Sequence, residues 1–138
     1  MSLSRRSIRE SAFLIIYEKS FGNYELDELF DIAKESENIP INSEVEKIVN
    51  GVFEHLDELD NIISQFSQKR SIERIPKINL SLLRLAIYEA KYSENVPTNV
   101  AISEAVAIAE KYAFDSDAKF INGALGAYSR SEGASLNA

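Results

Sequence analysis

The sequence predicts an all-α protein of about seven helices, arranged as two packed helical subdomains. Three observations support this prediction. Apolar residues recur at steps of three and four along most of the 138 residues, a spacing that puts them on one face of a helix. Alternation with a period of two, which would indicate strands, extends over no useful length. The composition, 45% hydrophobic and 27% charged, is that of a folded globular chain.

The N-terminal half carries three periodic stretches. The first predicted helix covers residues 4–21 and has a stripe of apolar side chains that we expect to be buried. This stripe consists of Ile8, Ala12, Ile15 and Ile16. A short acidic helix follows at residues 25–34. The longest periodic stretch covers residues 43–66, and a bend near His55 would split it into two helices.

The C-terminal half opens on a basic connector at residues 67–76. We place the seam between the two subdomains here, near residues 70–78, as a break within one domain and not as a linker. Residues 79–92 are apolar nearly all round, which indicates a central helix that is buried by its neighbours. The sequence therefore predicts that the second subdomain is built around this helix.

Two further helices complete the predicted fold. One begins at Pro97 and carries a stripe of alanines, which allows a neighbouring helix to approach closely. The last helix opens at residues 115–117. Residues 131–138 are small and polar, and we expect them to form a disordered tail. Residues 1–130 are thus predicted to form a single helical domain.

The net charge of −7 hides an uneven distribution. Residues 1–20 hold four basic and two acidic residues, and residues 61–74 hold three basic and one acidic. Residues 24–60 hold twelve acidic and two basic residues. A local basic face can bind a polyanion on an acidic protein, but the acidic remainder weakens its field. We therefore expect modest affinity for a polyanion in the absence of a partner.

Several classes of function lack the residues that they require. The chain has no cysteine, which removes disulfides and thiolate metal sites and fits a cytoplasmic location. One histidine, His55, is too few for a usual zinc site. No apolar run approaches the roughly 20 residues that span a bilayer. The carboxylates fall on predicted solvent faces, and no phosphate-binding loop or nucleophile elbow is present. We expect no enzyme, cofactor, metal or membrane partner.

Several short motifs occur at fixed spacings in one order. In the C-terminal half they are Leu83-Arg84 with Ala86 and Tyr88-Glu89, Val96-Pro97, Val100-Ala101-Ile102 with Glu104-Ala105, and Lys119-Phe120 with Asn122-Gly123. In the N-terminal half and the connector they are Arg5-Arg6, Arg9-Glu10, Ala12, Tyr17 and Ile72-Glu73-Arg74-Ile75-Pro76. Together they resemble the NusB family of bacterial transcription antitermination factors. Two positions depart from the family pattern: Ser7, where a third basic residue is common, and the Asp115-Ser116-Asp117 opening of the last helix.

The resemblance implies a non-enzymatic RNA-binding protein of two packed helical subdomains. Members of the family bind the boxA element of nascent, single-stranded RNA together with a small ribosomal protein, NusE. The complex joins other Nus factors on RNA polymerase and suppresses premature termination, notably in ribosomal RNA operons. In single-stranded RNA the bases are available for stacking and edge hydrogen bonds while arginines hold the phosphates.

The resemblance also implies where RNA binds, on surfaces at the start of the first and of the last helix, which should lie side by side. The expected RNA contacts are Arg5, Arg6, Arg9, Arg74, Lys119, Phe120 and Asn122. Most of them have a structural alternative: Arg5, Arg6 and Arg9 form a solvated helix N-terminus with Arg9 paired to an acid, Phe120 packs in the core, or Asn122 caps a neighbouring helix. Arg74 reaches RNA or bonds the carbonyls of adjacent helix ends. Asn79, at the start of the central helix, is the expected contact with the partner protein.

Two other functions remain open. The first is a protein–protein interaction module of the same complex with little RNA affinity of its own, which the acidic segment at residues 24–60 and the presence of Ser7 favour. The second is a fragment of an enzyme, because a domain of this fold occurs fused ahead of a ribosomal RNA methyltransferase domain. The chain ends soon after its last predicted helix, which argues against the second function.

Overall fold

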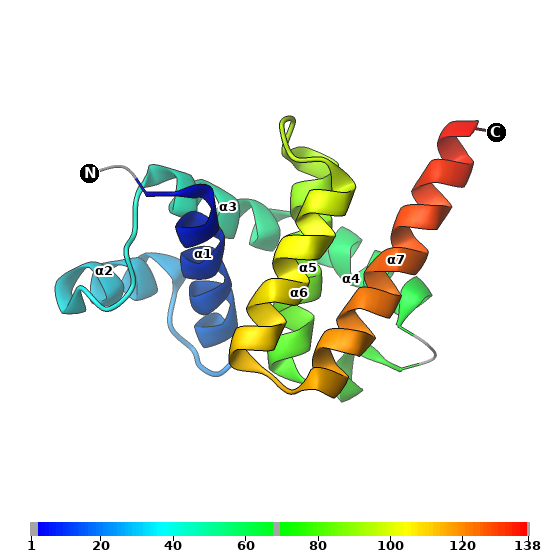
Figure 1. The fold of residues 1–138 in the computed structure, drawn as a ribbon. Helices are drawn as coiled ribbons and strands as arrows, with labels where there is room; N and C mark the ends of the chain where they lie inside the picture. The colour runs from blue at the N-terminus through cyan, green and yellow to red at the C-terminus, as the bar shows by residue number, and fades with distance from the viewer. Residues whose placement is uncertain (1–2, 68–69, 138) are drawn as a thin grey trace. The chain divides into compact units, whose positions relative to one another are not determined.

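The computed structural model describes residues 3–67 and 70–137, with side chains described as far as residue 132. All regular structure in this part of the chain is helical, which confirms the predicted fold class. The elements are α1 (Arg5–Lys19), α2 (Leu26–Ser36), α3 (Ser43–Glu54), α4 (Leu56–Phe66), the short 3-10 helix η1 (Ile72–Arg74), α5 (Lys77–Tyr92), α6 (Thr98–Tyr112) and α7 (Asp115–Asn137) (Figure 1).

The chain divides into two compact units, an N-terminal unit at Met1–Glu54 and a C-terminal unit at His55–Ala138. The predicted bend near His55 is confirmed, because α3 ends at Glu54 and α4 begins at Leu56. The boundary expected near residues 70–78 has to be corrected. Helix α4 packs on α5 and α7, so the connector at residues 67–76 lies inside the C-terminal unit.

The N-terminal unit is built on α1, which packs against both α2 and α3. The stripe predicted for the first helix is buried as expected. Apolar side chains of all three helices are buried in this unit, each contributing on the order of 1.5–3 kcal/mol for a residue of Val, Leu, Ile or Phe size. These are Ile8, Ala12, Phe13, Ile15, Ile16, Leu29, Phe30, Ala33, Val45, Val49 and Val52.

Side chains and backbone conformations fix where the helices of this unit begin and end. The hydroxyl of Ser4 accepts a 3.1 Å hydrogen bond from the backbone N–H of Ser7 and caps α1. The amide oxygen of Asn42 accepts a 2.9 Å bond from the backbone N–H of Val45 at the start of α3. Helix α2 stops at Ser36 because the next residue, Glu37, has a φ of 58°, the left-handed conformation that ends a helix.

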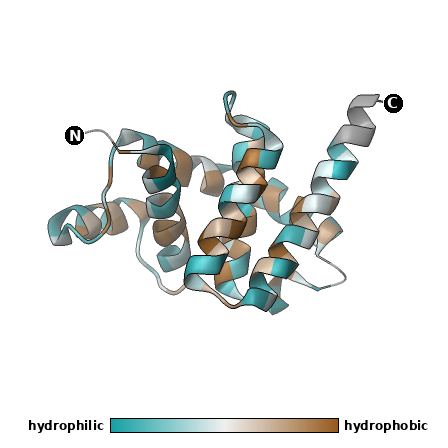
Figure 2. Cartoon of the chain, viewed as in Figure 1, coloured by the Kyte–Doolittle hydropathy of each residue, from teal (hydrophilic) through white to brown (hydrophobic). Residues whose placement is uncertain are grey.

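The C-terminal unit is built on α5, against which α4, α6 and α7 pack. Its apolar residues face all three neighbours and are buried, which confirms the predicted central helix: Leu80, Leu82, Leu83, Leu85, Ala86 and Ile87. The alanine stripe of α6 is buried as well, and it consists of Ala101, Ala105 and Ala109. Figure 2 shows hydrophobic and hydrophilic residues alternating around α6 and α7, as amphipathic helices require.

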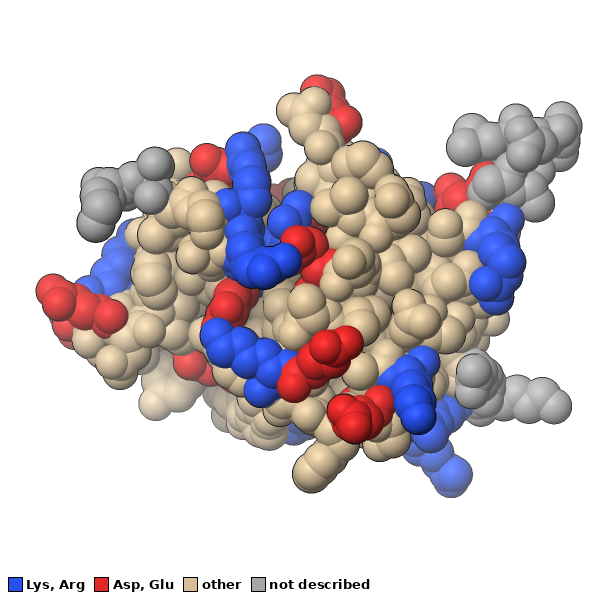
Figure 3. All heavy atoms as spheres, viewed as in Figure 1, with Lys and Arg blue, Asp and Glu red and all other residues tan. Residues whose placement is uncertain are grey.

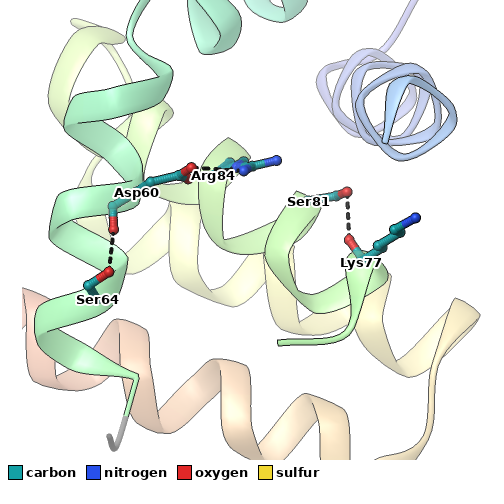
Figure 4. A network of polar contacts seen from close by, with 5 residues as sticks. All are labelled: Asp60, Ser64, Lys77, Ser81 and Arg84. Atoms are coloured by element: carbon teal, nitrogen blue, oxygen red, sulfur yellow. Dashed lines mark hydrogen bonds and ion pairs between the residues drawn. The ribbon is translucent and has the colours of Figure 1, made fainter. Parts of the chain in front are cut away.

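A bidentate ion pair between Arg84 and Asp60 joins α5 to α4 (Figure 4). The Nε and Nη2 atoms of Arg84 lie 2.8 and 2.9 Å from the two carboxylate oxygens of Asp60. Two serines bond within their own helices: the Ser64 hydroxyl donates to the carbonyl of Asp60 at 3.0 Å, and the Ser81 hydroxyl donates to the carbonyl of Lys77 at 2.7 Å. The half-buried guanidinium of Arg84 and the buried hydroxyl of Ser81 therefore have partners, as burial requires.

The end of the chain differs from the sequence-based expectation. Helix α7 continues to Asn137, where a disordered tail was expected over residues 131–138, and Ala138 lies outside the described residues. The segment contains no proline, so nothing interrupts the backbone hydrogen bonds of the helix. Within the described residues, no helix is both long enough and apolar enough to cross a membrane.

Candidate nucleic-acid interface

The first turn of α1 exposes two of the three arginines that the sequence singles out. Arg5 and Arg6 are exposed, whereas Arg9 is only 8% exposed. The guanidinium of Arg5 forms an ion pair with Glu44 at the start of α3, and Arg6 and Arg9 also interact with other groups of the protein. The N-terminus of a helix carries about half a positive charge, which adds to the field of these arginines. This end of the N-terminal unit is suited to hold phosphate.

A second basic surface lies in the C-terminal unit, around the first turns of α7. Lys119 is exposed and the neighbouring Phe120 is half-buried. Arg74 is exposed in η1, within the connector that leads from α4 to α5. Figure 3 shows basic side chains gathered near the start of α7, with acidic side chains beside them. We call Arg70, Arg74, Lys119 and Phe120 the connector surface.

Arg70 belongs to this surface although sequence reasoning did not select it. Its guanidinium carbon lies 4.7 Å from the centroid of the Phe120 ring, a cation–π contact. The two residues are far apart in the sequence, so no local pattern relates them. The only available signal was composition, because Arg70 is one of the basic residues of the connector. Phe120 is therefore half-buried, and the guanidinium of Arg70 covers one face of its ring.

Asn122 is exposed one turn from Lys119 and lines a groove between α6 and α7. The groove has a volume of about 620 Å³. Its polar lining includes the amides of Asn99 and Asn122, the hydroxyl of Ser103 and the guanidinium of Arg130. The amide of Asn122 is thus available to a base edge and is not packed inside the helix bundle.

Asn79 lies in the interior and not on a docking surface. It has no exposed area, and its amide nitrogen donates a 3.0 Å hydrogen bond to the carboxylate of Asp117. The other oxygen of Asp117 accepts a 3.1 Å bond from the backbone N–H of Phe114 at the start of α7. The amide oxygen of Asn79 has no hydrogen-bond partner among the described residues. Asn79 therefore ties the start of α5 to the start of α7, and its contact with a partner protein remains a prediction.

His55, Tyr88 and Tyr92 form an aromatic cluster in the C-terminal unit. The His55 ring stacks on that of Tyr92, with 4.2 Å between centroids, and Tyr92 donates a hydrogen bond to Glu58. This bond raises the pKa of Tyr92. Burial, with the charges of Glu132 and Glu58, raises the pKa of Tyr128 to about 12. Among the described residues no group of His, Asp or Glu is placed to hold a metal ion.

The described residues place this protein among small all-helical proteins, with two basic surfaces that can hold a polyanion. The particular family follows from the sequence. Residues 6–130 match the NusB family, and the chain belongs to it. This confirms the resemblance, the fold class and the expectation of a non-enzymatic protein.

Individual relatives match over almost the whole chain. Transcription antitermination protein NusB of Thermoanaerobacter sp. (strain X514) is 37% identical over 132 residues, which cover 95% of this chain and 94% of the relative. T. maritima NusB has a TM-score of 0.79 at 30% identity, covering 91% of this chain and 90% of its own. The crystal structure of antitermination factors NusB and NusE in complex with dsRNA contains a chain with a TM-score of 0.77 at 29% identity, covering 89% of this chain and 93% of its own.

Proposed function

We propose that this protein is a transcription antitermination factor that binds boxA-containing single-stranded RNA together with the small ribosomal protein NusE. The resulting complex joins other Nus factors on RNA polymerase, for example in ribosomal RNA operons. The observation that supports the proposal most directly is the likeness to the structure of NusB and NusE in complex with dsRNA. That likeness extends over most of both chains, so it includes both units of this protein.

The chemistry of the two basic surfaces supports RNA as the ligand. Arg5 and Arg6 on the N-terminal unit, and Lys119 and Arg74 on the C-terminal unit, supply cations for phosphates. Phe120 supplies a ring on which an unpaired base stacks. Arg9, Asn79 and Asn122 complete the proposed residues. Arg9 is expected to act weakly on RNA, because only 8% of it is exposed.

Several residues in these surfaces differ in how directly they can reach a ligand. Asn122 is exposed in the α6–α7 groove, and its amide offers both a donor and an acceptor to a base edge. Asn79 is buried, so its proposed influence on NusE would act through the start of α7, to which it is hydrogen-bonded. RNA contacts are therefore proposed for exposed side chains and partner binding for the scaffold beneath them.

A second function, a protein-interaction module with little RNA affinity of its own, is favoured by two observations. The guanidinium of Arg5 already has an ion-pair partner in Glu44, and Ser7 stands where a third basic residue would add charge. Both features lower the positive potential that RNA would meet at the start of α1. In that case the protein would bind NusE but contribute little to RNA affinity.

The experiment that separates the two functions measures RNA binding with and without the partner. Fluorescence anisotropy of a labelled boxA-like RNA is followed as this protein is added, alone and with an equimolar amount of NusE, and a scrambled RNA of equal length serves as control. The antitermination proposal expects NusE to tighten binding of the boxA-like RNA by more than threefold. A smaller change contradicts joint binding, and no RNA binding at low salt despite intact NusE binding supports the interaction module.

A further inference from the structure

We propose that Arg70 and Phe120 form a clamp for one unpaired RNA base, which inserts between the guanidinium and the phenyl ring and stacks on both. The inference rests on the proposed RNA-binding function. It adds a contact residue, Arg70, and a mode of binding in which a single base lies between two flat groups. The starting geometry is the contact of the two side chains, with 4.7 Å between the guanidinium carbon and the ring centroid.

The clamp has to open before a base can enter. Flat groups stack about 3.5 Å apart, so a base between two partners requires them to be separated by about 7 Å. The Arg70 side chain must therefore move outward by roughly 2–3 Å from its present position. Arg70 is exposed and its side chain is long and flexible, so it can make this movement without disturbing the helices.

Two hydrogen bonds to Ser67 hold the backbone at Arg70, so we expect the movement to occur in the side chain. The hydroxyl of Ser67 donates a 2.7 Å hydrogen bond to the carbonyl of Arg70, and the N–H of Arg70 donates a 3.1 Å bond to the carbonyl of Ser67. Ser67 is fully buried. This pair of bonds ties Arg70 to the buried serine that follows α4, on the side of the Phe120 ring.

The other side of the clamp is also anchored. Ala118 and Ile121, on either side of Lys119 and Phe120 in the sequence, are 7% and 0% exposed and hold the first turns of α7 in the core. The ring of Phe66, near the end of α4, packs edge-on against that of Tyr128, with 6.0 Å between centroids. The end of α4 and helix α7 are therefore packed together, which limits how far the backbones of the two clamp residues can separate.

The strengths of the competing contacts favour insertion of a base. An exposed cation–π contact changes an equilibrium by about two- to fivefold. Stacking of a base on an aromatic side chain in single-stranded nucleic-acid complexes is worth roughly fivefold to more than a hundredfold. A base that enters also keeps a guanidinium on its second face, so the arginine loses one stacking partner and gains another. Stacking tolerates all four bases, and purines, with the larger ring area, are expected to bind more tightly.

The test uses the full chain with NusE and a set of boxA-like RNAs, each with a fluorescent purine analogue at one position. Stacking of the analogue in the complex should quench its fluorescence at one position of the RNA. We expect Arg70→Ala and Phe120→Leu each to weaken RNA binding by about fivefold or more and to reduce quenching at that same position. Lys91→Ala, which removes an exposed cation in the last turn of α5, outside both the connector surface and the α6–α7 groove, is the control and should leave the quenching unchanged.

The Arg70→Lys variant separates stacking from charge. Lysine keeps the positive charge but lacks the planar guanidinium, so a clamp predicts about threefold weaker binding with an unchanged dependence on salt. Wild-type affinity and quenching in Arg70→Lys would show that only charge matters and would overturn the clamp while leaving the proposed function intact. Tighter binding by Arg70→Ala would also overturn it, because Arg70 would then be a cap that a base displaces. A wild-type complex that binds no RNA would overturn both.

Discussion

The amide nitrogen of Asn79 lies 3.0 Å from a carboxylate oxygen of Asp117, and this hydrogen bond joins the first turns of α5 and α7. Asp117 uses its second oxygen to accept the backbone N–H of Phe114. One carboxylate thus caps α7 and orients it against the central helix. Because Lys119 and Phe120 belong to the same first turns of α7, the position of the connector surface depends on this bond.

The hydrogen bond between Asn79 and Asp117 is predicted to stabilise the folded protein. Asn79→Ala removes the bond and leaves a small cavity, and we expect the free energy of unfolding to fall by about 1–2 kcal/mol, measured by urea denaturation. The control is Asn95→Ala, in the exposed loop between α5 and α6, which should change the free energy of unfolding by less than about 0.5 kcal/mol.

Calorimetric titration of the Asn79→Ala variant with NusE then tests the proposed role of Asn79 in partner binding. An unchanged affinity for NusE in a folded Asn79→Ala variant would remove Asn79 from the partner-binding residues.

The Arg84–Asp60 pair should matter more than an ion pair on the surface. The side chains of Arg84 and Asp60 are 12% and 23% exposed, whereas those of Lys34 and Glu46 are 48% and 34% exposed, at 3.1 Å. Asp60→Ala leaves a largely buried guanidinium without its carboxylate, and we expect a loss of roughly 2–3 kcal/mol in the free energy of unfolding. Glu46→Ala, the matched control, should cost at most about 1 kcal/mol.

The greater loss of stability expected for Asp60→Ala than for Glu46→Ala can be tested directly. Equal losses for Asp60→Ala and Glu46→Ala, measured by urea denaturation at one pH and salt concentration, would show that burial does not strengthen the Arg84–Asp60 pair. Replacing both partners by apolar residues, as in Arg84→Met with Asp60→Leu, should recover part of the stability that Asp60→Ala loses. The double variant removes the unpaired charge together with its partner, so a recovery identifies desolvation as the cause.

The helices and their buried faces could be predicted from the sequence because apolar spacing is a local property. The stripe that begins at Ile8 and the apolar run around Leu83 each define a face within a few turns of chain. The division into units could not be predicted in this way. It depends on which helices α4 packs against, and that choice is made by contacts between segments distant in the sequence.

The candidate interface could be predicted only in part, for the same reason. The basic residues Arg5 and Lys119 follow from the resemblance and are exposed as a binding role requires. The burial of Arg9 and Asn79 depends on tertiary packing that sequence motifs do not encode. The contact of Arg70 with Phe120 joins a connector to a helix that starts much later in the chain, so it became visible only in three dimensions.

Ionisation of Tyr128 is predicted to lower the free energy of unfolding at alkaline pH. Its pKa is raised to about 12 because the phenol is buried and lies near Glu132 and Glu58, whereas the phenol of an unfolded chain ionises near pH 10. The stabilising contribution is complete below about pH 10 and is lost as the pH rises from about 10 to 12, with a slope of at most about 1.4 kcal/mol per pH unit.

The measurement is urea denaturation at a series of pH values for the wild type and for Tyr128→Phe. The variant cannot ionise at this position, so its free energy of unfolding should fall less steeply above about pH 10 than that of the wild type. At neutral pH the difference between the two proteins should be constant. Parallel curves across the alkaline range would show that the Tyr128 phenol titrates alike in the folded and unfolded states.

Arg6 tests the N-terminal basic surface through the dependence of RNA binding on salt. Each phosphate contact with single-stranded RNA adds about 0.7 to the slope of the logarithm of the binding constant against the logarithm of salt concentration. Arg6→Ala should therefore weaken binding of the boxA-like RNA to the complex with NusE and lower this slope by about 0.7. The matched control is Lys34→Ala, which removes an exposed cation from the same unit that is paired with Glu46. An unchanged slope in Arg6→Ala would remove Arg6 from the RNA contacts. Equal reductions in both variants would mean that Arg6 acts through the general charge of the unit and not through a phosphate contact.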